Sequence, residues 1–375
     1  MFLAAARFAM LRGRPARALY YLRRTIAVSP KPHIPFTAPQ PKMKNGHRPE
    51  LSVIIPTLNR AESLRRCLAS ICRQSLNADR YEVLVIDNGS SDHTAGVCRE
   101  FARTMRHLHY KKEPVPGLLA ARHAGWREAG ADILTFCDDD IEALPTWLET
   151  VLSLFRKYPD ADLVGGNNLP AFDALPPPPW AELSWREDCG VEFNGYFSFI
   201  RGVTGEQKVK PWLVFGCNYS IRRKRLELVR GFEPDITPCI YFQGGGETGI
   251  YCFSGAPAPQ AILADNASVT HHMPPQRLTD GYMYNRGAYM MISELYSYLR
   301  GRGRQDSPPE YLDRYRPADI GLRRAHEGKL YAYAAYTRAV LKSPTLRAWI
   351  GMPHYFGYEK QPGSTGIIDK SRYWE

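Results

Sequence analysis

The sequence lacks the signals that mark several common protein classes. None of its eight cysteines forms a C-x-x-C pair or a Cys/His spacing of the zinc-binding kind. No stretch reaches the roughly 18 consecutive apolar residues that a membrane-spanning helix requires. No internal repeat is present, and the segment after the first strand-like run, IPTLNRAES, contains no glycine. These absences weigh against a zinc site, a spanning helix, a repeat architecture and a glycine-rich phosphate loop.

The positive charge is confined to one end of the chain. The net charge is +11 and the pI is about 9.2. Residues 1–50 hold ten Lys or Arg and one acid, so +9 of the total lies there and the remaining chain is close to balanced. A nucleic-acid groove would need basic residues within the folded domain, and no helix-turn-helix signature is present. We therefore expect no nucleic-acid partner, and a DNA-binding protein is the weakest interpretation.

Residues 1–28 alternate apolar residues with six arginines. An unbroken apolar core, as in a signal peptide, is interrupted at Arg7. The pattern fits a basic amphipathic helix lying on an anionic membrane surface. A solvated leader, or a helix packed on the domain, fits it equally well.

With cysteines such as Cys67, Cys98 and Cys137 inside apolar runs, free thiols in a reducing compartment are expected. The predicted location is cytoplasmic, with peripheral contact at the inner membrane face.

Three regions are predicted from the distribution of proline, charge and apolar residues. Residues 1–49 form the basic leader and a Pro/Lys-rich linker, residues 50–300 the folded domain, and residues 301–375 a linker and a helical C-terminal extension. Within the domain, strand-like LSVIIP, YEVLVID and DILTFC alternate with helical segments, one of them at 117–129. This alternation predicts an α/β fold with a mostly parallel central sheet flanked by helices.

Several local details are also predicted. Asn59 and Glu62 have capping-box spacing, which predicts a helix start between them. Segments 196–200 and 212–217 are strand-like. Arg222 to Arg225 are expected on a solvated helix face.

Polar side chains follow each of the three predicted parallel strands, where ligands bind in open α/β sheets. They are Pro56, Thr57 and Asn59, then Asp87, then Asp138, Asp139 and Asp140. Three adjacent carboxylates repel one another unless a cation neutralises them. Mg²⁺ or Mn²⁺ takes carboxylate ligands and completes its shell with substrate phosphates. An exposed acidic turn that caps the next helix is the alternative.

The order of motifs over residues 51–290 resembles the family 2 glycosyltransferases, which have the GT-A fold. The motifs are SVIIPTLNR (52–60), VLVIDNGSSD (83–92), GLLAARHAG (117–125), ILTFCDDDI (133–141), FGCNYSIRRKRLELVRGF (215–232), GGGETG (244–249) and VTHHMPPQRLT (269–279). Residues before 50 and after about 300 lie outside the resemblance.

The resemblance implies a role for each matching residue. The donor nucleotide would be held by Pro56, Thr57, Asn59, Asp87, Arg122, Asp138 and Asp139, with Asp87 at a uracil-type base, so a UDP-sugar is favoured. A divalent metal would be held by Asp138, Asp140 and either His271 or His272. A loop beneath the donor sugar and acceptor would contain Gly216, Cys217, Asn218 and Gly246.

The resemblance also implies a catalytic base. Glu247 matches the first member of the acidic pair of the family, and Thr248 replaces the second. If the base belongs to the second position, Glu247 is not the base, and this alternative stays open. The implied reaction is a metal-dependent, inverting transfer of a sugar to a hydroxyl of a glycan, lipid-linked or other acceptor. A nucleotidyltransferase and a non-catalytic nucleotide-sugar-binding module are the competing interpretations.

Overall fold

The structure is a computed structural model that describes residues 48–114, 117–173, 176–177, 181, 184–229, 231–232, 246–247, 250, 257–284, 286–287, 290 and 328. The leader, the Pro/Lys-rich linker, Thr248 and nearly all of the C-terminal extension lie outside the described residues, so the predicted domain boundaries stay predictions. Within the described part, no helix has both the length and the apolar character needed to cross a membrane.

The centre of the fold is an eight-stranded sheet in the order β11-β13-β6-β12-β4-β1-β2-β3. Its strands are β1 (Leu51–Thr57), β2 (Tyr81–Asp87), β3 (Leu108–Lys112), β4 (Ile133–Cys137), β6 (Leu163–Gly165), β11 (Glu206–Val209), β12 (Asn218–Arg222) and β13 (Ala261–Ala264). Strands β4, β1, β2 and β3 are parallel, whereas β12 is antiparallel to both β4 and β6. The α/β class is confirmed, and residues 51–137 supply four neighbouring parallel strands. Strands β6 and β13 form a further parallel pair in the same sheet.

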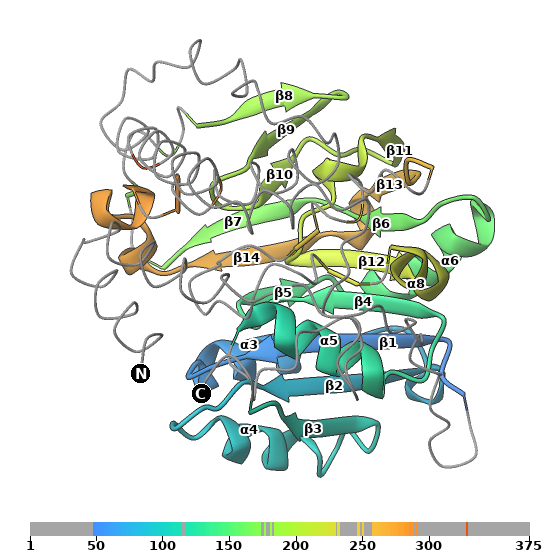
Figure 1. Cartoon of the computed structure of the whole chain (residues 1–375), viewed down its shortest axis with the longest axis vertical. Helices are drawn as coiled ribbons and strands as arrows, with labels where there is room; N and C mark the ends of the chain where they lie inside the picture. Colours follow the sequence, from blue (N-terminus) through green and yellow to red (C-terminus); the bar gives the residue numbers. More distant parts are fainter. Residues whose placement is uncertain are drawn as a thin grey trace, which may run out of the picture.

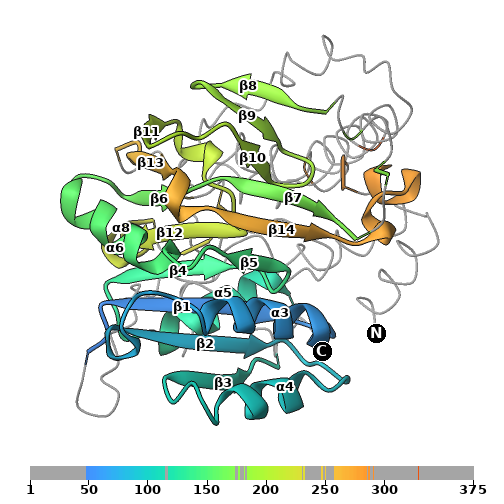
Figure 2. The same cartoon turned by 180° about the vertical axis from the view of Figure 1, so that it is seen from behind.

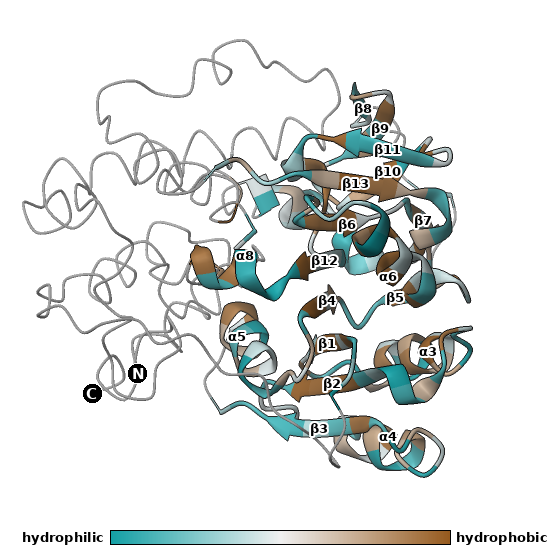
Figure 3. Cartoon of the chain, turned by 90° about the vertical axis from the view of Figure 1, so that its right-hand side faces the viewer, coloured by the Kyte–Doolittle hydropathy of each residue, from teal (hydrophilic) through white to brown (hydrophobic). Residues whose placement is uncertain are grey.

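Helices cover both faces of this sheet. On one face lie α3 (Ala61–Ile71), α4 (Thr94–Phe101) and α6 (Trp147–Lys157), and on the other lie α5 (Leu118–Glu128) and α8 (Arg223–Leu228), as Figure 3 shows. Strand β1 serves both layers because its side chains alternate between the faces. Ile54 belongs to the apolar core beneath α5, and Val53 and Ile55 to the core beneath α3, α4 and α6.

A second, six-stranded sheet, which the sequence did not predict, has the order β5-β14-β7-β10-β9-β8 (Figures 1 and 2). Its strands are β5 (Ile141–Ala143), β7 (Asn168–Phe172), β8 (Arg186–Asp188), β9 (Val191–Asn194), β10 (Phe199–Arg201) and β14 (Val269–Met273). Strand β5 begins directly after Asp140 and pairs antiparallel with β14, with Ile141 opposite His271. This pairing joins the acidic run to a segment about 130 residues further along the chain.

Short 3-10 helices complete the described elements. They are η1 (Ala78–Arg80), η2 (Pro211–Leu213), η3 (Asp265–Ala267) and η4 (Pro275–Arg277). Residues 212–217, expected as a strand, instead contain most of η2 and a turn, and the strand starts at Asn218. The strand expected at 196–200 begins later, at Phe199.

The predicted capping box is wrong. Helix α3 begins at Ala61, between the two residues as expected, but its N-cap residue makes no side-chain capping bond, and the Ala61 N–H donates to Asp92 Oδ2 at 3.0 Å. Asn59 has a left-handed backbone (φ 54°), and its Oδ1 accepts a hydrogen bond from the Ser91 N–H at 2.7 Å. Glu62 contacts the His93 ring at 2.8 Å. Both side chains connect the loop after β1 to the loop after β2 instead of capping their own helix.

The expectation of a solvated face at Arg222 to Arg225 is also wrong. Arg223 and Arg225 are buried. Arg223 donates hydrogen bonds to the carbonyls of Ala129 (2.7 Å) and Ala131 (2.8 Å), just after α5. Arg222 donates to carbonyls at and just after the end of α6. Cations beside the carboxyl end of a helix satisfy carbonyls that have no partner within the helix.

We predict that Gly125→Ala destabilises the protein by about 1–3 kcal/mol, because a Cβ at this position would lie 2.3 Å from Cγ2 of Ile54 in β1. Gly96→Ala in α4 is the matched control, since the nearest atoms to its Cβ lie at 3.9 Å. Alanine there should be neutral or stabilising by up to about 1 kcal/mol. Urea unfolding of the full chain measures both free energies, and equal stability of the two variants would contradict the close packing of α5 on β1.

Candidate active site

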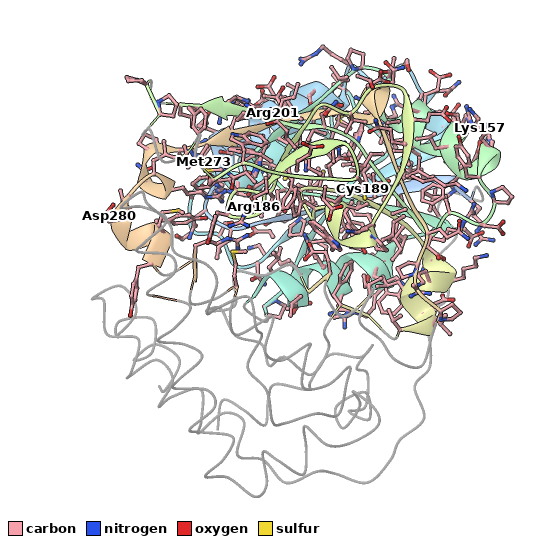
Figure 4. All side chains as sticks on the ribbon, turned by 90° about the horizontal axis from the view of Figure 1, so that it is seen from above. Lys157, Arg186, Cys189, Arg201, Met273 and Asp280 are labelled. Carbon is pink, nitrogen blue, oxygen red and sulfur yellow. The ribbon has the colours of Figure 1, made fainter. Side chains whose placement is uncertain are left out.

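The predicted polar residues do meet at one edge of the molecule, the edge at which the parallel strands end. Thr57 is the last residue of β1, Asp87 is the last of β2, and Asp138 follows the last residue of β4. The arrows of β2, β7 and β14 point to the same side in Figure 1. Met273, at the end of β14, lies on the opposite side of the described part from Lys157 at the end of α6 (Figure 4).

One group in the described part has the geometry for a metal ion. Ligand atoms of Asp138, Asp140 and His271 all lie within 4.8 Å of one another. The β5–β14 pairing selects His271 over His272, since neighbouring residues of a strand point to opposite faces. His271 Nε2 lies 3.3 Å from Asp140 Oδ1, whereas His272 contacts Glu142 (2.7 Å) and Asp173 (3.4 Å).

The residues of this group fit a divalent cation. Asp140 and His271 are buried, yet neither the Asp140 oxygens nor the His271 nitrogens have a hydrogen bond of good geometry within the described residues. Buried polar atoms without such bonds are costly unless another partner satisfies them. Carboxylates are the ligands preferred by Mg²⁺ and Mn²⁺, and neutral imidazole is a common metal ligand.

Two arginines approach the same acids. Arg60 lies 2.6 Å from Asp139 Oδ1 and 2.9 Å from Asp140 Oδ2. Arg277 lies 3.3 Å from Asp140 Oδ2. Arg60 stands inside the SVIIPTLNR motif, directly after β1, so its position beside the strand ends was the available signal.

Asp139 is directed inward and is held by the protein itself. Its Oδ2 accepts a hydrogen bond from the Thr57 hydroxyl at 2.7 Å, and Oδ1 accepts one from Arg60. Thr57 and Asp139, both expected at the nucleotide, are therefore bonded to each other. Asp138 and Asp140, two residues apart, are the acids of the run that join His271 in the metal-capable group.

The three aspartates differ in their electrostatic environment. Burial and the neighbouring Asp140 raise the pKa of Asp138. Burial raises the pKa of Asp139 to about 6, although Arg60 and Thr57 oppose this shift. Burial works in the same direction on Asp140, but His271, Arg60 and Arg277 outweigh it and hold the pKa of Asp140 below its usual range. Asp140 is thus the acid of the run that is held most firmly in its ionised form.

Arg122 and Glu247 form an ion pair beside Asp138. Arg122 Nη1 donates to Glu247 Oε1 at 2.5 Å, and Nη2 donates to the Gly216 carbonyl at 3.0 Å and lies 3.8 Å from Asp138 Oδ1. Burial disfavours the charged guanidinium, but Glu247 and Asp138 outweigh it and raise the pKa of Arg122. Strand β12, paired with β4 so that Asn218 faces Cys137, brings Gly216 to this place.

The residues of the predicted sugar loop lie in two different environments. Gly216 lies beside the ion pair of Arg122 and Glu247, and Gly246 directly precedes Glu247 in the chain. Cys217 is buried in the apolar core beneath α3, α4 and α6. The Asn218 amide bonds to Trp147 Nε1 and the Ala267 carbonyl, both at 2.9 Å. The side chains of Cys217 and Asn218 are thus buried and packed against structural partners.

The predicted base-binding residues line the ends of β1 and β2. Asp87 is buried, accepting hydrogen bonds from the Tyr110 hydroxyl and from the Ser90 N–H at 2.7 Å. Burial opposes its ionisation, but these hydrogen bonds outweigh burial and lower the pKa of Asp87. Pro56 is buried within β1 opposite Ile86, and Asn59 is exposed in the next loop.

Comparison with known proteins gives the family. The family described as "Glycosyl transferase family 2" matches residues 52–222, which contain β1 to β12 and the acidic run. The chain carries a family 2 glycosyltransferase domain. The structure gives this domain an α/β arrangement with two sheets, and the GT-A fold is what the resemblance implies for it.

Individual relatives cover parts of this glycosyltransferase domain. The chain is 38% identical over 120 residues to glycosyltransferase AglE of Haloferax volcanii, covering 32% of this chain and 39% of that protein. It is 39% identical over 212 residues to validoxylamine A glucosyltransferase of Streptomyces hygroscopicus subsp. jinggangensis, covering 51% of this chain and 49% of that protein. The chain thus spans half or less of the length of these curated relatives.

Among solved structures, the chain is similar to a mannosyltransferase of Pyrobaculum calidifontis in complex with GDP-Man and Mn²⁺. The identity is 18%, the coverage is 95% of this chain and 96% of that one, and the TM-score is 0.45.

Tyr110→Phe should lower the free energy of unfolding by about 1.5–3 kcal/mol near pH 7, the range for a hydrogen bond to a charged group. The lowered pKa of Asp87 gives this contribution a pH dependence. The stabilisation is present above the ordinary aspartate pKa of about 3.9, which applies to the unfolded chain. It is lost as the pH falls through the lower pKa that Asp87 has in the folded protein. Urea unfolding between about pH 3 and 7 should show wild type and variant converging in acid. A difference independent of pH would contradict the role of Asp87 ionisation.

Proposed function

We propose that this protein is a metal-dependent, inverting glycosyltransferase that moves a sugar from a nucleotide-diphosphate sugar to an acceptor hydroxyl. The proposal rests on one observation: the metal-capable group and the Glu247 carboxylate both lie beside Arg122. Asp138, of the metal-capable group, lies 3.8 Å from Arg122, and Glu247 lies 2.5 Å from it. A cation site and a carboxylate base side by side are what an in-line displacement of a diphosphate requires.

On the donor side, Asp138, Asp140 and His271 would hold Mg²⁺ or Mn²⁺. A bound cation neutralises charge that develops on the leaving diphosphate. Arg60 and Arg277 border the same group and can pair with phosphate oxygens. Asp87 and Asn59, at the ends of β1 and β2, are proposed at the nucleotide with Pro56 and Thr57. We favour a UDP-sugar because the resemblance assigns Asp87 to a uracil-type base.

On the acceptor side, Glu247 would act as the general base. Its side chain is 17% exposed, so one part faces solvent while the ion pair holds the other. The acceptor oxygen forms a bond to the anomeric carbon as the bond from that carbon to the diphosphate oxygen breaks, and the acceptor proton passes to Glu247. A single displacement from the opposite face inverts the anomeric configuration, and no covalent enzyme intermediate forms.

The proposed acceptor class follows from the basic leader of the chain. A glycan or lipid-linked hydroxyl would suit a chain that touches the inner membrane face through residues 1–28. Fractionation with and without residues 1–30 tests this contact, and a protein that is soluble in both forms contradicts it.

We predict that Mn²⁺ with UDP or a UDP-sugar raises the melting temperature of the wild type. Binding at a hundredfold excess over Kd contributes about 2.7 kcal/mol, or roughly 5–10 °C for a domain of this size. GDP and GDP-sugars serve as the comparison for the base. His271→Ala and Asp140→Asn should abolish the metal-dependent shift.

The matched control is His272→Ala, since this neighbour points away from Asp140. It should keep the shift, because only His271 belongs to the metal-capable group. A shift lost equally in both histidine variants would argue against the assigned metal ligand. If no nucleotide shifts the wild type under any metal, the donor site itself is rejected.

We further predict that Glu247→Gln lowers the turnover of the donor by about 100- to 10,000-fold, the usual contribution of a general base, with little change in nucleotide affinity. Hydrolysis of the donor that gives the thermal shift measures turnover, with water as the acceptor. A variant as active as the wild type would move the base to another residue. A wild type that binds nucleotide with metal but never turns over would favour the non-catalytic binding module.

A further inference from the structure

Arg122 is buried more deeply than the two acids that it contacts. Its side chain is 2% exposed, whereas those of Asp138 and Glu247 are 33% and 17% exposed. Residues 119–126 of α5 are all buried, so the helix delivers the guanidinium from inside the protein. The Phe232 ring lies beside it, 5.3 Å from Cζ to the ring centroid. A phosphate arriving from solvent meets the two carboxylates before it meets this cation.

The absence of a side chain at Gly216 makes room for the ion pair. A Cβ at this position would lie 1.8 Å from Glu247 Oε1 and 2.4 Å from Arg122 Nη2. The carbonyl of the same residue accepts a hydrogen bond from Nη2. Gly216 therefore contacts both partners and permits their approach.

The turn that carries Glu247 is held against α5 at further points. Gly246 has a left-handed backbone (φ 75°), and a Cβ there would lie 2.6 Å from Leu119 Cδ2. Leu119 and Arg122 are three residues apart, so they lie on one face of the helix. On the other side of the turn, Arg225 Nη2 donates to the Ile250 carbonyl at 3.1 Å. These contacts place Gly246 and Ile250, on either side of Glu247, and Arg122 holds the Glu247 carboxylate itself.

From this geometry we propose that Arg122 is the positioning residue for Glu247 and not a ligand of the donor nucleotide. The inference rests on the proposed function, since it assigns a role relative to the base. The ion pair engages Oε1 and leaves Oε2 to receive the acceptor proton. Because Arg122 also lies 3.8 Å from Asp138, one cation fixes the distance between the metal-binding acids and the base.

The two roles predict opposite changes in nucleotide affinity. For a phosphate ligand, Arg122→Met would weaken binding of nucleotide diphosphate with Mn²⁺ by tenfold or more. For a positioning residue, the variant removes positive charge near Asp138, which favours a cation there, so Kd should stay within about threefold of wild type or fall. Turnover at saturating donor should fall by about 100-fold, the scale of a misplaced catalytic group.

The experiment compares Arg122→Met and Arg122→Lys with Arg127→Met in the full chain. Arg127 is on the same helix and pairs with Glu113 at 3.2 Å, away from the acidic run. Calorimetry with UDP and Mn²⁺ gives Kd, or with GDP and Mn²⁺ if GDP gives the thermal shift, and hydrolysis of the matching nucleotide sugar gives kcat. Lysine keeps the positive charge but lacks the planar guanidinium that can bond to Glu247 and Gly216 at once. The kcat of Arg122→Lys should therefore lie between those of Arg122→Met and wild type. Arg127→Met should match wild type in both measurements.

Gly216→Ala serves as the second variant if Arg122→Met does not fold. Its added methyl group displaces Glu247 from Arg122 without removing either charge, and kcat should again fall with Kd retained. A Kd raised tenfold or more with kcat unchanged, in an active wild type, overturns the inference and leaves the proposed function standing. A wild type that neither binds nucleotide with metal nor turns it over overturns both.

Discussion

The fold is organised around the neutralisation of a buried acidic run. Asp139 and Asp140 are 3% and 2% exposed at the end of β4. Ionised carboxylates cannot be buried without partners, because desolvation costs several kcal/mol for each ion. The partners come from separate segments: Arg60 from the loop after β1, Arg122 from α5, His271 from β14 and Arg277 from η4. Four segments that are distant in the sequence therefore meet at the acids.

The turn between β4 and β5 separates Asp139 from the two acids of the metal-capable group. Asp139 points inward to Thr57 and Arg60, whereas Asp138 and Asp140 join His271. The intervening acid holds Arg60, and Arg60 in turn reaches Asp140. Arg60 therefore links Asp139 to Asp140, and Asp140 in turn belongs to the metal-capable group with Asp138.

Local patterns predicted the parallel half of the sheet and the acids at its strand ends, since buried strands and turns depend on nearby residues. Contacts between distant segments were not predictable. The choice of His271 over His272 depends on the pairing of β14 with β5, which the spacing of residues does not encode. The burial of Arg223 depends on carbonyls near the end of α5, 92 and 94 residues away. A run of arginines on a helix is usually solvated, so local reasoning placed it on the surface.

The strand order also has a consequence for the synthesis of the chain. Strand β4 lies between β1 and β12 in the finished sheet, and β12 follows it by about 80 residues. At about 5–20 residues per second, β4 remains an open sheet edge for several seconds after the first parallel strands can pair. Such an edge is a template for pairing with another chain. Nascent protein would be most prone to aggregation in this interval, and binding of chaperones to residues 133–137 would protect it until β12 emerges.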